Sequence, residues 1–332
     1  MKYDLTVIVP VYNTEQYLER CLNSIVNQKN REYVKLRVIC VNDGSPDNSL
    51  AILESYSQQY ECIEVFSKEN GGIADARNYG LDLVEDSLYV TYLDSDDFWA
   101  EGFLAYFSQS LSKQSDMIFF DIILSDYNGQ AIKTLKVNRD TDVQNINRFI
   151  VLKHAPWTRI CKTSLYDHVR FPKGKLYEDL AVLPYLTSQA KQIEYIQVPL
   201  YHYIVNTPGS IMNTSSKKIF DIYPALEYLF ELFGEQFEMY KEEIHYLALE
   251  HLGIGHTYRL LKYPKTTKQD FKDIVLFMEK YFGKQWHKNK YMKKGVHKNN
   301  INSALSGLMP LILKILHLKW FNVFQLLKKG KD

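Results

Sequence analysis

Three carboxylates directly follow a run of apolar residues near position 90. Residues 89–99 read Tyr-Val-Thr-Tyr-Leu-Asp-Ser-Asp-Asp-Phe-Trp, which places Asp94, Asp96 and Asp97 within four positions. Carboxylates this close repel one another unless a cation or hydrogen-bond donors offset them. The Asp-x-Asp spacing lets two of them face one hard cation, with water and phosphate oxygens completing its shell. A solvated acidic turn is the alternative, whereas an EF-hand loop is excluded because Trp99 stands where its glycine belongs.

The elements that must position these carboxylates alternate along the first hundred residues. β-branched and aromatic runs predict strands over 5–13, 36–41, 63–66 and 88–93. In the segments between these strands the apolar residues recur at helical spacing, which predicts helices there. We expect Pro10 to end the first strand, because it has no N–H to donate to a ladder. The alternation predicts an α/β fold with a doubly wound parallel sheet, in which ligands bind at the carboxyl ends of the strands.

Polar and glycine-rich turns follow the other expected strands. Asp43, after the second strand, can accept a hydrogen bond from a base N–H or a ribose hydroxyl, or can cap the next turn. Gly71 and Gly72 have no Cβ, so their backbone can approach a ligand closely. Arg77 offers a fork of donors for phosphate or base oxygens, the alternative being an exposed helical arginine. Asp75 is a further candidate whose role the sequence does not separate from helix capping.

Four ordered segments resemble the signatures of family 2 glycosyltransferases, which have the GT-A fold. They are Val-Ile-Val-Pro-Val-Tyr-Asn at 7–13, Val-Asn-Asp-Gly-Ser at 41–45, the Asn-Gly-Gly…Ala-Arg-Asn-Tyr-Gly run at 70–80, and Leu-Asp-Ser-Asp-Asp at 93–97. Residues 155–162, 171–180 and 199–212 resemble the acceptor half of bacterial members that build polysaccharides.

The resemblance covers about residues 3–214 and implies the domain organisation. We expect a GT-A domain over 1–214, with a nucleotide-sugar half at 1–100 and an acceptor half at 101–214. The remaining residues, 215–332, are expected to form a C-terminal helical region. The implied sheet is mostly parallel and doubly wound.

The resemblance also implies a donor site. Asp43 would contact uracil, and Pro10 and Tyr12 would line the base pocket. Asp96 would touch a Mn²⁺ or Mg²⁺ that bridges the diphosphate, and Asp94 would contact ribose or metal-bound water. A UDP-sugar is the favoured donor. The complete set expected to hold it is Pro10, Tyr12, Asp43, Gly71, Gly72, Arg77, Asp94, Ser95 and Asp96.

The acceptor side is expected to supply proton transfer. A single displacement at an anomeric carbon needs one carboxylate near the acceptor hydroxyl, and the resemblance points to Asp179 as this base. Glu178 would contact the sugar or the acceptor; an ordinary acidic helix N-terminus is the alternative for both. Single displacement implies inversion at the anomeric carbon. Asp97 holds the sugar or caps the following segment.

The acceptor half contains three further candidate residues, His202, Ser210 and Trp157. His202 is a third metal ligand or a diphosphate donor, or else a packed ring. The family often has an arginine shortly after this position, where Ile204 and Val205 stand, so His202 or Ser210 is the candidate to replace it. Trp157 forms a sugar-stacking platform or belongs to the core.

Charge is divided unevenly along the 332 residues. The net charge is +1, yet residues 280–332 contain twelve lysines and Asp332, giving +11, so residues 1–279 carry −10. The residues that recur at helical spacing over 311–329 are Ile312, Ile315, Leu316, Lys319, Trp320, Val323, Phe324 and Leu327. A basic amphipathic helix with aromatic residues predicts interfacial membrane binding; packing on the enzyme body or a dimer contact are the alternatives.

These features place limits on class and location. No uncharged apolar run approaches the roughly 20 residues of a membrane span, and no signal peptide is expected before the first strand. We expect four free cysteines and a cytoplasmic protein, peripheral on the inner face of the plasma membrane. Self-association into a homo-oligomer is compatible with the sequence. Nucleic acid is not an expected partner, because the basic segment contains no arginine and no nucleic-acid motif.

The function expected from sequence is therefore a metal-dependent inverting glycosyltransferase. It would move a hexose or N-acetylhexosamine from a nucleotide diphosphate to a glycan or lipid-linked saccharide in cell-surface polysaccharide synthesis. A catalytically inactive nucleotide-sugar-binding adaptor is the alternative from another class. A sugar-nucleotide pyrophosphorylase is disfavoured, because the Gly-x-Gly-x-x-Arg type of opening is absent.

Overall fold

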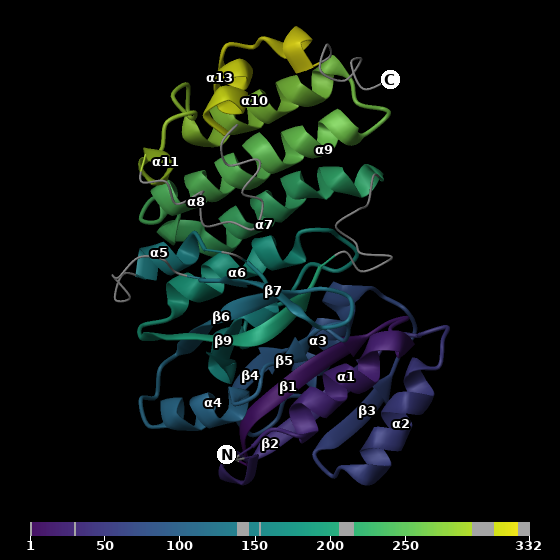
Figure 1. Ribbon diagram of the computed structural model, residues 1–332. Coiled ribbons are helices and arrows are strands. Elements are labelled where there is room, and N and C mark those ends of the chain that lie inside the picture. Colours follow the sequence, from purple (N-terminus) through teal and green to yellow (C-terminus); the bar gives the residue numbers. More distant parts are fainter. Residues whose placement is uncertain are drawn as a thin grey trace. The chain divides into compact units, whose positions relative to one another are not determined.

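The computed structural model describes residues 2–29, 31–137, 146–152, 154–205, 216–293 and 309–324 (Figure 1). The chain forms two compact units. Unit 1 comprises residues 1–146 and 153–209, and unit 2 comprises residues 147–152 and 210–332. The boundary expected between 214 and 215 lies next to residues outside the described part of the chain. The short segment 147–152 joins the second unit, which the sequence did not indicate.

The first half of unit 1 alternates strands and helices as the sequence predicts. Its elements are β1 (Tyr3–Val11), α1 (Glu15–Val26), η1 (Arg31–Tyr33), β2 (Leu36–Asn42), α2 (Ser49–Gln59), β3 (Ile63–Ser67), α3 (Ile73–Asp82) and β4 (Ser87–Tyr92). The second half contains β5 (Phe98–Trp99), α4 (Phe103–Leu111), β6 (Met117–Ser125), β7 (Ala131–Leu135), η2 (Pro156–Thr158), β8 (Arg159–Lys162), η3 (Thr163–Tyr166), α6 (Glu178–Gln189) and β9 (Ile193–Ile204). Helix α5 (Ile146–Ile150) comes between β7 and η2 in the sequence and belongs to unit 2, apart from its first residue.

Within the described residues, nine strands form one sheet. Their order is β3-β2-β1-β4-β8-β6-β9-β5, with β7 paired to β6. β1 to β4 are parallel, and β6 is parallel to β9, whereas β5, β7 and β8 pair antiparallel to their neighbours. The mostly parallel α/β sheet is thus confirmed. Because the chain winds outward from β1 to β3 and returns to place β4 on the other side of β1, the strand order reverses between β1 and β4.

The expectation that Pro10 ends the first strand is wrong. β1 continues to Val11, whose carbonyl accepts a hydrogen bond from the Asp43 backbone N at 2.8 Å on the β2 side. Because successive residues direct their polar groups to opposite sides of a strand, the missing N–H of Pro10 faces the β4 side. The β1–β4 ladder has already ended at Ile8 and Tyr92. Pro10 therefore follows the end of that ladder and interrupts no pairing of β1 with β4, while β1 stays paired with β2 through Val11.

Helix α3 lies very close to β1. A Cβ added at Gly80 would be 2.5 Å from Cγ2 of Ile8, which is shorter than any ordinary carbon contact. Only glycine therefore lets this helix approach the sheet so closely. The approach fixes the position of Arg77 and Asn78, which precede Gly80 on the same helix and are both buried.

Unit 2 is helical. Its elements are η5 (Lys217–Asp221), α7 (Ile222–Phe233), η6 (Gly234–Gln236), α8 (Lys241–Ala248), the π-helix η7 (Leu249–His256), α9 (Thr257–Lys262), α10 (Lys268–Phe282), α11 (Lys290–Lys293) and α13 (Met309–His317). Aromatic rings fill much of its core. The ring of Phe230, for example, lies within 6.0 Å of the rings of Phe237, Phe277, Tyr281 and Phe282.

The amphipathic helix expected over 311–329 differs from the prediction. α13 ends at His317, and the backbone of Lys319 is left-handed, with φ 59°. The Lys319 N–H donates to Leu316 O and the Trp320 N–H to Ile315 O, which is the hydrogen-bond pattern of a Schellman cap. The helix thus stops there, and a further turn follows at 321–324. Residues 325–332 lie outside the described part of the chain.

Most of the apolar stripe of this segment packs inside unit 2. Ile312, Leu316 and Phe324 are buried, and the ring of Phe324 stacks on Phe271 of α10 at 4.7 Å. The side chain of Lys319 pairs with Glu279 at 3.3 Å. The structure therefore favours the alternative in which the helix packs on the protein body, and the idea that the whole stripe meets a membrane is wrong. No described helix is long and apolar enough to cross a bilayer.

The four cysteines are free thiols, as expected. Cys21, Cys40 and Cys161 are buried, and Cys62 is partly buried. Burial raises the pKa of the Cys161 thiol to about 11, so it stays protonated near neutral pH. These thiols behave as small apolar core residues rather than as nucleophiles.

Candidate active site

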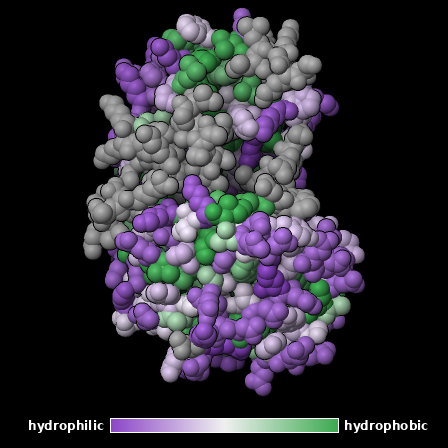
Figure 2. All heavy atoms as spheres, in the orientation of Figure 1, coloured by the Kyte–Doolittle hydropathy of each residue, from purple (hydrophilic) through white to green (hydrophobic). Residues whose placement is uncertain are grey.

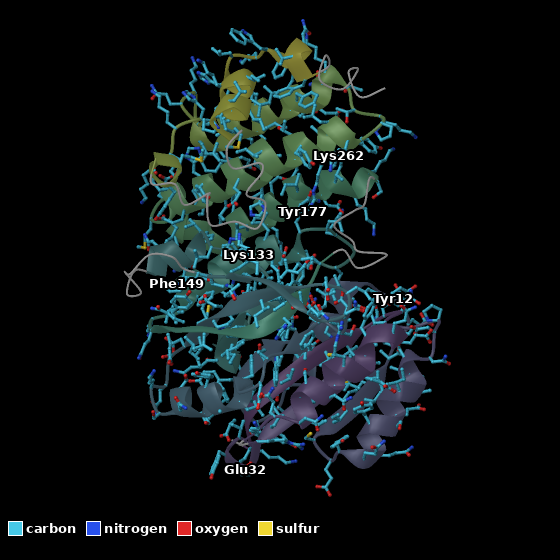
Figure 3. The ribbon with its side chains drawn as sticks, in the orientation of Figure 1. Tyr12, Glu32, Lys133, Phe149, Tyr177 and Lys262 are labelled. Atoms are coloured by element: carbon cyan, nitrogen blue, oxygen red, sulfur yellow. The ribbon has the colours of Figure 1, made fainter. Side chains whose placement is uncertain are left out.

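The predicted donor-site residues gather at the carboxyl ends of β1, β2 and β4. Asp43 follows β2, and Asp94 and Asp96 follow β4, where both are partly exposed. Tyr12 follows β1 with half of its surface exposed (Figure 3). Ser95 accepts a hydrogen bond from the Thr14 hydroxyl at 3.0 Å, which links the β1 and β4 turns. The switch point of the sheet thus presents an exposed aromatic ring beside two carboxylates.

Arg77 joins the two acidic motifs of unit 1. Its Nη2 lies 2.9 Å from Asp94 Oδ1, and its Nη1 lies 2.8 Å from Glu178 Oε1. The residue is only 4% exposed, so the alternative of an exposed helical arginine is wrong. Burial alone would lower the pKa of Arg77, but the two carboxylates outweigh it and raise the pKa above its ordinary value. The guanidinium therefore stays charged and ties the end of β4 to the start of α6.

Asp43 holds the glycine-rich loop. Its carboxylate accepts hydrogen bonds from the backbone N–H groups of Gly71 at 2.9 Å and Gly72 at 2.8 Å. Lys68 pairs with the same carboxylate at 2.7 Å, and Asp43 is 2% exposed. Gly72 has φ 84°, a conformation that glycine adopts without strain. Asp43 thus caps the loop at 71–72, whereas the alternative interpretation expected it to cap the next turn.

Asp97 and Tyr201 anchor the Asp-x-Asp turn. The Tyr201 hydroxyl donates to Asp97 Oδ2 at 2.8 Å and accepts from the Asp94 backbone N at 3.2 Å. The Ile204 N–H donates to the other Asp97 oxygen at 2.7 Å. Burial, with the charges of Asp96 and Asp94, raises the pKa of Asp97 well above its ordinary value. A buried carboxyl bonded on both oxygens serves to fix the turn, so the geometry does not favour a sugar contact for Asp97.

His202 and Trp157 are both packed against aromatic rings. The His202 ring stacks on Phe98 with centroids 4.1 Å apart, and its Nδ1 is 2.9 Å from the Ser125 hydroxyl. Burial and the nearby Arg20 charge lower the pKa of His202 to about 4, so the ring is neutral near pH 7. Trp157 is 4% exposed and stacks on Tyr201 at 4.4 Å, which favours the core interpretation. Ser210 lies outside the described residues.

The proposed base belongs to the first turn of α6. Glu178 and Asp179 are its first two residues, and Tyr177 before them has φ 65° (Figure 3). A bulky residue with positive φ is strained, and such strain persists only where the surroundings hold it. The segment that leads into α6 is fixed to α3 at Phe171, because the Asn78 side chain donates to Phe171 O at 2.7 Å and accepts from Phe171 N at 2.9 Å.

Sequence reasoning missed several of these contacts. Lys68, Asn78 and Tyr201 were not among the expected site residues. Lys68 and Tyr201 nevertheless bind residues that were, and Asn78 fixes the segment before α6. Asn78 follows Arg77 directly in the Ala-Arg-Asn motif, and Tyr201 precedes His202, so both stand in segments that carried the resemblance. The bonds Lys68–Asp43, Asn78–Phe171 and Tyr201–Asp97 join residues that are 25, 93 and 104 positions apart, and spacing along the chain does not reveal them.

The carboxylates of this site fit a divalent cation that is shared with a substrate. Asp94 and Asp96 are partly exposed and two residues apart, and carboxylate oxygen suits Mg²⁺ or Mn²⁺. Among the described residues, no three His, Cys, Asp or Glu side chains are grouped to hold a metal by themselves. Such a cation would need further ligands from water and phosphate oxygens, as is usual for Mg²⁺ at diphosphates.

Comparison with known proteins places the chain in a family. A family model described as glycosyl transferase family 2 matches residues 6–171. Glycosyltransferase GlyA of Streptococcus pneumoniae is 31% identical over 64% of this chain and 32% of its own. The minor teichoic acid biosynthesis protein GgaB of Bacillus subtilis is 32% identical over 65% of this chain and 24% of its own. The chain belongs to glycosyl transferase family 2, and it spans about a third or less of the length of these two relatives.

The solved structures support the fold. The crystal structure of S. aureus TarS residues 1–349 in complex with UDP-GlcNAc has a TM-score of 0.73 and 20% sequence identity. The match covers 99% of this chain and 91% of that one, so it includes the helices of unit 2. The GT-A fold implied by the sequence resemblance is therefore confirmed, together with a C-terminal helical part.

Proposed function

We propose that this protein transfers a sugar from a nucleotide diphosphate, with UDP the favoured carrier, to a hydroxyl of a glycan or lipid-linked saccharide. The observation that carries the proposal is the Asp94–Arg77–Glu178 bridge. It joins the carboxylate motif at the end of β4 to the acidic start of α6 within unit 1. A donor-binding motif and a candidate base are thus held at one place. The teichoic acid assignment in the name of GgaB supports a cell-surface polymer as the product.

The donor half offers contacts for each part of the donor. Tyr12 presents an exposed ring for stacking on the base, with Pro10 beside it. The Gly71–Gly72 loop, held by Asp43, precedes the N-terminus of α3, where backbone N–H groups favour negative charge. A base or ribose that contacts Asp43 would share this carboxylate with the loop and with Lys68.

Asp96 and Asp94 would hold a Mn²⁺ or Mg²⁺ at the diphosphate. Among the described residues His202 is not grouped with these two carboxylates, so water and phosphate oxygens would supply the other contacts. The ion, when bound, would offset the charge that develops on the departing diphosphate. Asp94 is also paired with Arg77, so it would present one oxygen to the ion and keep the other on the guanidinium. The Tyr201 hydroxyl holds the Asp94 backbone in place.

The proposed chemical step is a single displacement. Asp179 accepts the proton of the acceptor hydroxyl as its oxygen bonds to the anomeric carbon. The bond from that carbon to the diphosphate oxygen breaks, and the electron pair leaves with the diphosphate. The new bond forms opposite the one that breaks, so an α-linked donor yields a β-linked product. Glu178 remains on Arg77 and contacts the sugar or acceptor.

A panel of nucleotide sugars tests this function. Thermal shift and donor hydrolysis would be measured on the wild type and on Asp96→Ala, with Mn²⁺ and with chelator. We expect one nucleotide sugar to stabilise the wild type in the presence of the metal, and this effect to be lost in the variant. UDP-GlcNAc, the ligand of the TarS structure, is the first compound to include. Binding without transfer to any acceptor would favour the inactive adaptor instead.

We also propose peripheral attachment to the inner face of the plasma membrane, with a smaller contact than the sequence indicated. Leu311, Leu318 and Trp320 remain exposed in unit 2, and Figure 2 shows hydrophobic residues gathered at the surface near α13. Lys314 belongs to the same helix, and residues 280–332 carry +11. Exposed apolar side chains beside lysines suit an anionic lipid surface. A homo-oligomer remains a separate prediction.

Vesicle flotation tests this attachment. The full chain would be floated with vesicles of phosphatidylcholine and phosphatidylglycerol, and compared with the Leu311→Ser, Trp320→Ser double variant. Met239→Ser is the control, because Met239 is an apolar residue of unit 2 that is even more exposed than Leu311 and Trp320. We expect the double variant alone to lose binding. Equal flotation of all three proteins would contradict the proposal.

A further inference from the structure

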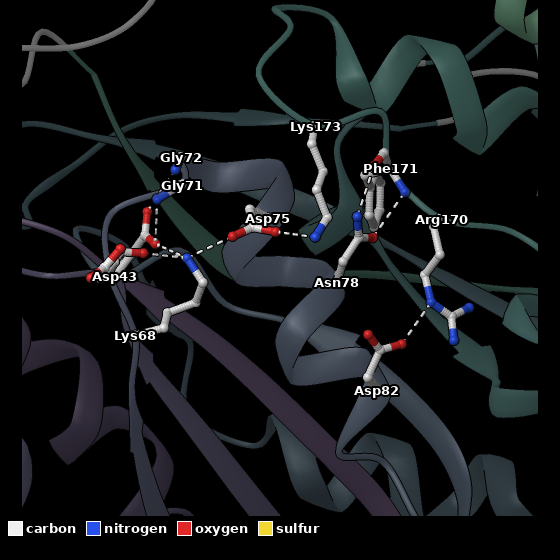
Figure 4. Close-up of polar contacts among 11 residues, drawn as sticks. Asp43, Lys68, Gly71, Gly72, Asp75, Asn78, Asp82, Arg170, Phe171 and Lys173 are labelled. Atoms are coloured by element: carbon white, nitrogen blue, oxygen red, sulfur yellow. Dashed lines mark hydrogen bonds and ion pairs between the residues drawn. The ribbon is translucent and has the colours of Figure 1, made fainter.

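One face of α3 is bound to the segment that leads into α6. Asp82 pairs with Arg170 at 2.8 Å, Asn78 makes two hydrogen bonds to the backbone of Phe171, and Asp75 pairs with Lys173 at 2.5 Å. Asp75, Asn78 and Asp82 are spaced three and four residues apart, so they share one helix face. Figure 4 shows the three contacts side by side. We call these six residues the α3 clasp.

The three contacts of the α3 clasp differ in strength. The Asn78–Phe171 bonds are buried and satisfy both backbone groups of Phe171, so they form a fixed anchor. The Asp82–Arg170 pair is exposed to solvent and contributes little. The Asp75 side chain is 15% exposed, whereas Lys173 is 67% exposed. The contact that is nearest to Glu178 in the sequence therefore joins a mostly buried carboxylate to a mostly exposed lysine side chain.

Asp75 also contacts the nucleotide-binding loop. Its Oδ2 lies 2.6 Å from Lys68 Nζ, and the same ammonium lies 2.7 Å from Asp43 Oδ1. A Cβ added at Gly71 would be 2.2 Å from Asp75 Oδ2, so this carboxylate lies directly against the loop. Figure 4 shows the row Asp43, Lys68, Asp75 and Lys173, with alternating charge. The hydrogen bonds from Lys173 and Lys68 lower the pKa of Asp75 below its ordinary value.

We propose that Asp75 is a positioning residue that couples nucleotide binding to the placement of Glu178 and Asp179. The inference rests on the proposed function and extends it. Each oxygen of Asp75 contacts one lysine, Oδ2 contacting Lys68 and Oδ1 contacting Lys173. Loss of one contact therefore strengthens the attraction between Asp75 and the other lysine. A nucleotide that binds at Asp43 and the Gly71–Gly72 loop competes for Lys68. The contact between Asp75 and Lys173 then strengthens, and Lys173 lies five residues before Glu178 in the sequence.

The coupling is reciprocal by thermodynamic necessity. If nucleotide binding changes the hold of Asp75 on Lys173, removal of Lys173 must change the affinity for nucleotide. This effect must pass through Asp75 and disappear when Asp75 has no charge. An effect of the Lys173 charge acting directly through space on a bound diphosphate would persist without Asp75. The two explanations therefore differ in a measurable way.

The test is a double-mutant cycle on UDP affinity, measured by titration calorimetry on the full chain. Lys173→Met is expected to change the UDP dissociation constant 3- to 10-fold in the wild-type background, and less than 1.5-fold in the Asp75→Asn background. Lys173→Arg, which keeps the charge, should restore the wild-type value. Lys133→Met on β7 is the matched control and should bind UDP like the wild type.

A second readout separates coupling from a purely structural role. Once a donor is identified, Lys173→Met should lower kcat of transfer 5- to 50-fold with little change in melting temperature, because Lys173 is mostly exposed. A fall in melting temperature with unchanged UDP affinity and kcat would overturn the coupling. An effect of Lys173→Met that is equal in both backgrounds would overturn it too. Wild-type protein that binds no UDP would contradict the favoured carrier of the proposed function and not the clasp.

Discussion

The two units of this protein treat buried ionisable groups differently. In unit 1 the buried Arg77 keeps its charge because Asp94 and Glu178 flank it, and Lys68 lies between Asp43 and Asp75. In unit 2, His256 is fully buried among aromatic rings, and burial lowers its pKa to about 3. Burial likewise raises the pKa of Glu250 to about 8.

The difference follows from the cost of removing a charge from water. An opposite charge nearby can offset this cost, or the buried group can avoid it by becoming neutral. Paired groups in unit 1 remain ionised and can respond to a charged ligand. Neutral groups in unit 2 act as parts of the core.

The division has exceptions. In unit 1, burial shifts the pKa of Asp97 and the pKa of His202 toward the neutral form of each group. In unit 2, the buried Glu243 pairs with Lys290 at 3.1 Å. Arg77, which joins the two acidic motifs of the proposed site, is a buried group that keeps its charge.

The largest expected effect is on catalysis. Asp179→Asn removes the proposed base but keeps the shape of the side chain. We expect transfer to fall about 10²- to 10⁴-fold, the usual contribution of a general base. UDP affinity should stay within twofold of the wild type, because Asp179 lies on the acceptor side. Transfer at the wild-type rate in steady-state kinetics would contradict the assignment of Asp179.

The next effect tests the paired charges of unit 1. Arg77→Met leaves Asp94 and Glu178 without their shared cation, and we expect a loss of about 3–5 kcal/mol of unfolding free energy. Lys29→Met is the control, because its pair with Glu101 is exposed and its loss should leave the unfolding free energy nearly unchanged. Urea unfolding followed by circular dichroism measures both. Equal losses would show that the buried bridge carries no special stability.

The neutral groups of unit 2 predict a dependence on pH. A histidine with a lowered folded pKa contributes stability that is complete above its ordinary pKa of 6.5 and is lost as the pH falls toward 3. Glu250, with its raised pKa, contributes stability below 4.5 that is lost as the pH rises toward 8. Between pH 4.5 and 6.5 the two groups therefore act in opposite directions.

Substitutions at these two positions separate the contributions. His256→Gln should reduce the loss of unfolding free energy on acidification by about 1.4 kcal/mol per pH unit between pH 4.5 and 6.5. Glu250→Gln should increase that loss by a similar amount. The measurement is urea unfolding at half-unit steps of pH. Slopes that match the wild type would mean that these side chains titrate normally.

The smallest effect concerns the end of α13. Lys319 has a left-handed backbone at the position of a Schellman cap where glycine is preferred. Lys319→Gly should raise the unfolding free energy by about 1 kcal/mol, partly offset by the loss of the exposed pair with Glu279. Lys319→Ala keeps the strain and also loses the pair, so it should not stabilise. A stabilising alanine would contradict the proposed strain.

Local order was predictable because it depends on neighbours in sequence. The strands β1 to β4 and the helices between them follow apolar periodicity, and the turns after them follow glycine and polar residues. The positions of Asp43, Asp94 and Asp96 at strand ends followed from the same pattern. The amphipathic stripe at the C-terminus was also visible, but periodicity does not say which surface a stripe covers. Only the packed helices showed that it is buried on α10.

The sequence by itself indicated the family, the order of strands and helices over about the first 93 residues, and which carboxylates follow the strand ends. Only the tertiary structure decided the partners: Arg77 binds Glu178 across 101 residues, and Asp97 binds Tyr201 across 104. The physical reason is that an ion pair depends on distance in space and on burial, and many oppositely charged residues are available along the chain. Burial then decides which of these groups keep their charge, because desolvation is strong only where the folded chain excludes water.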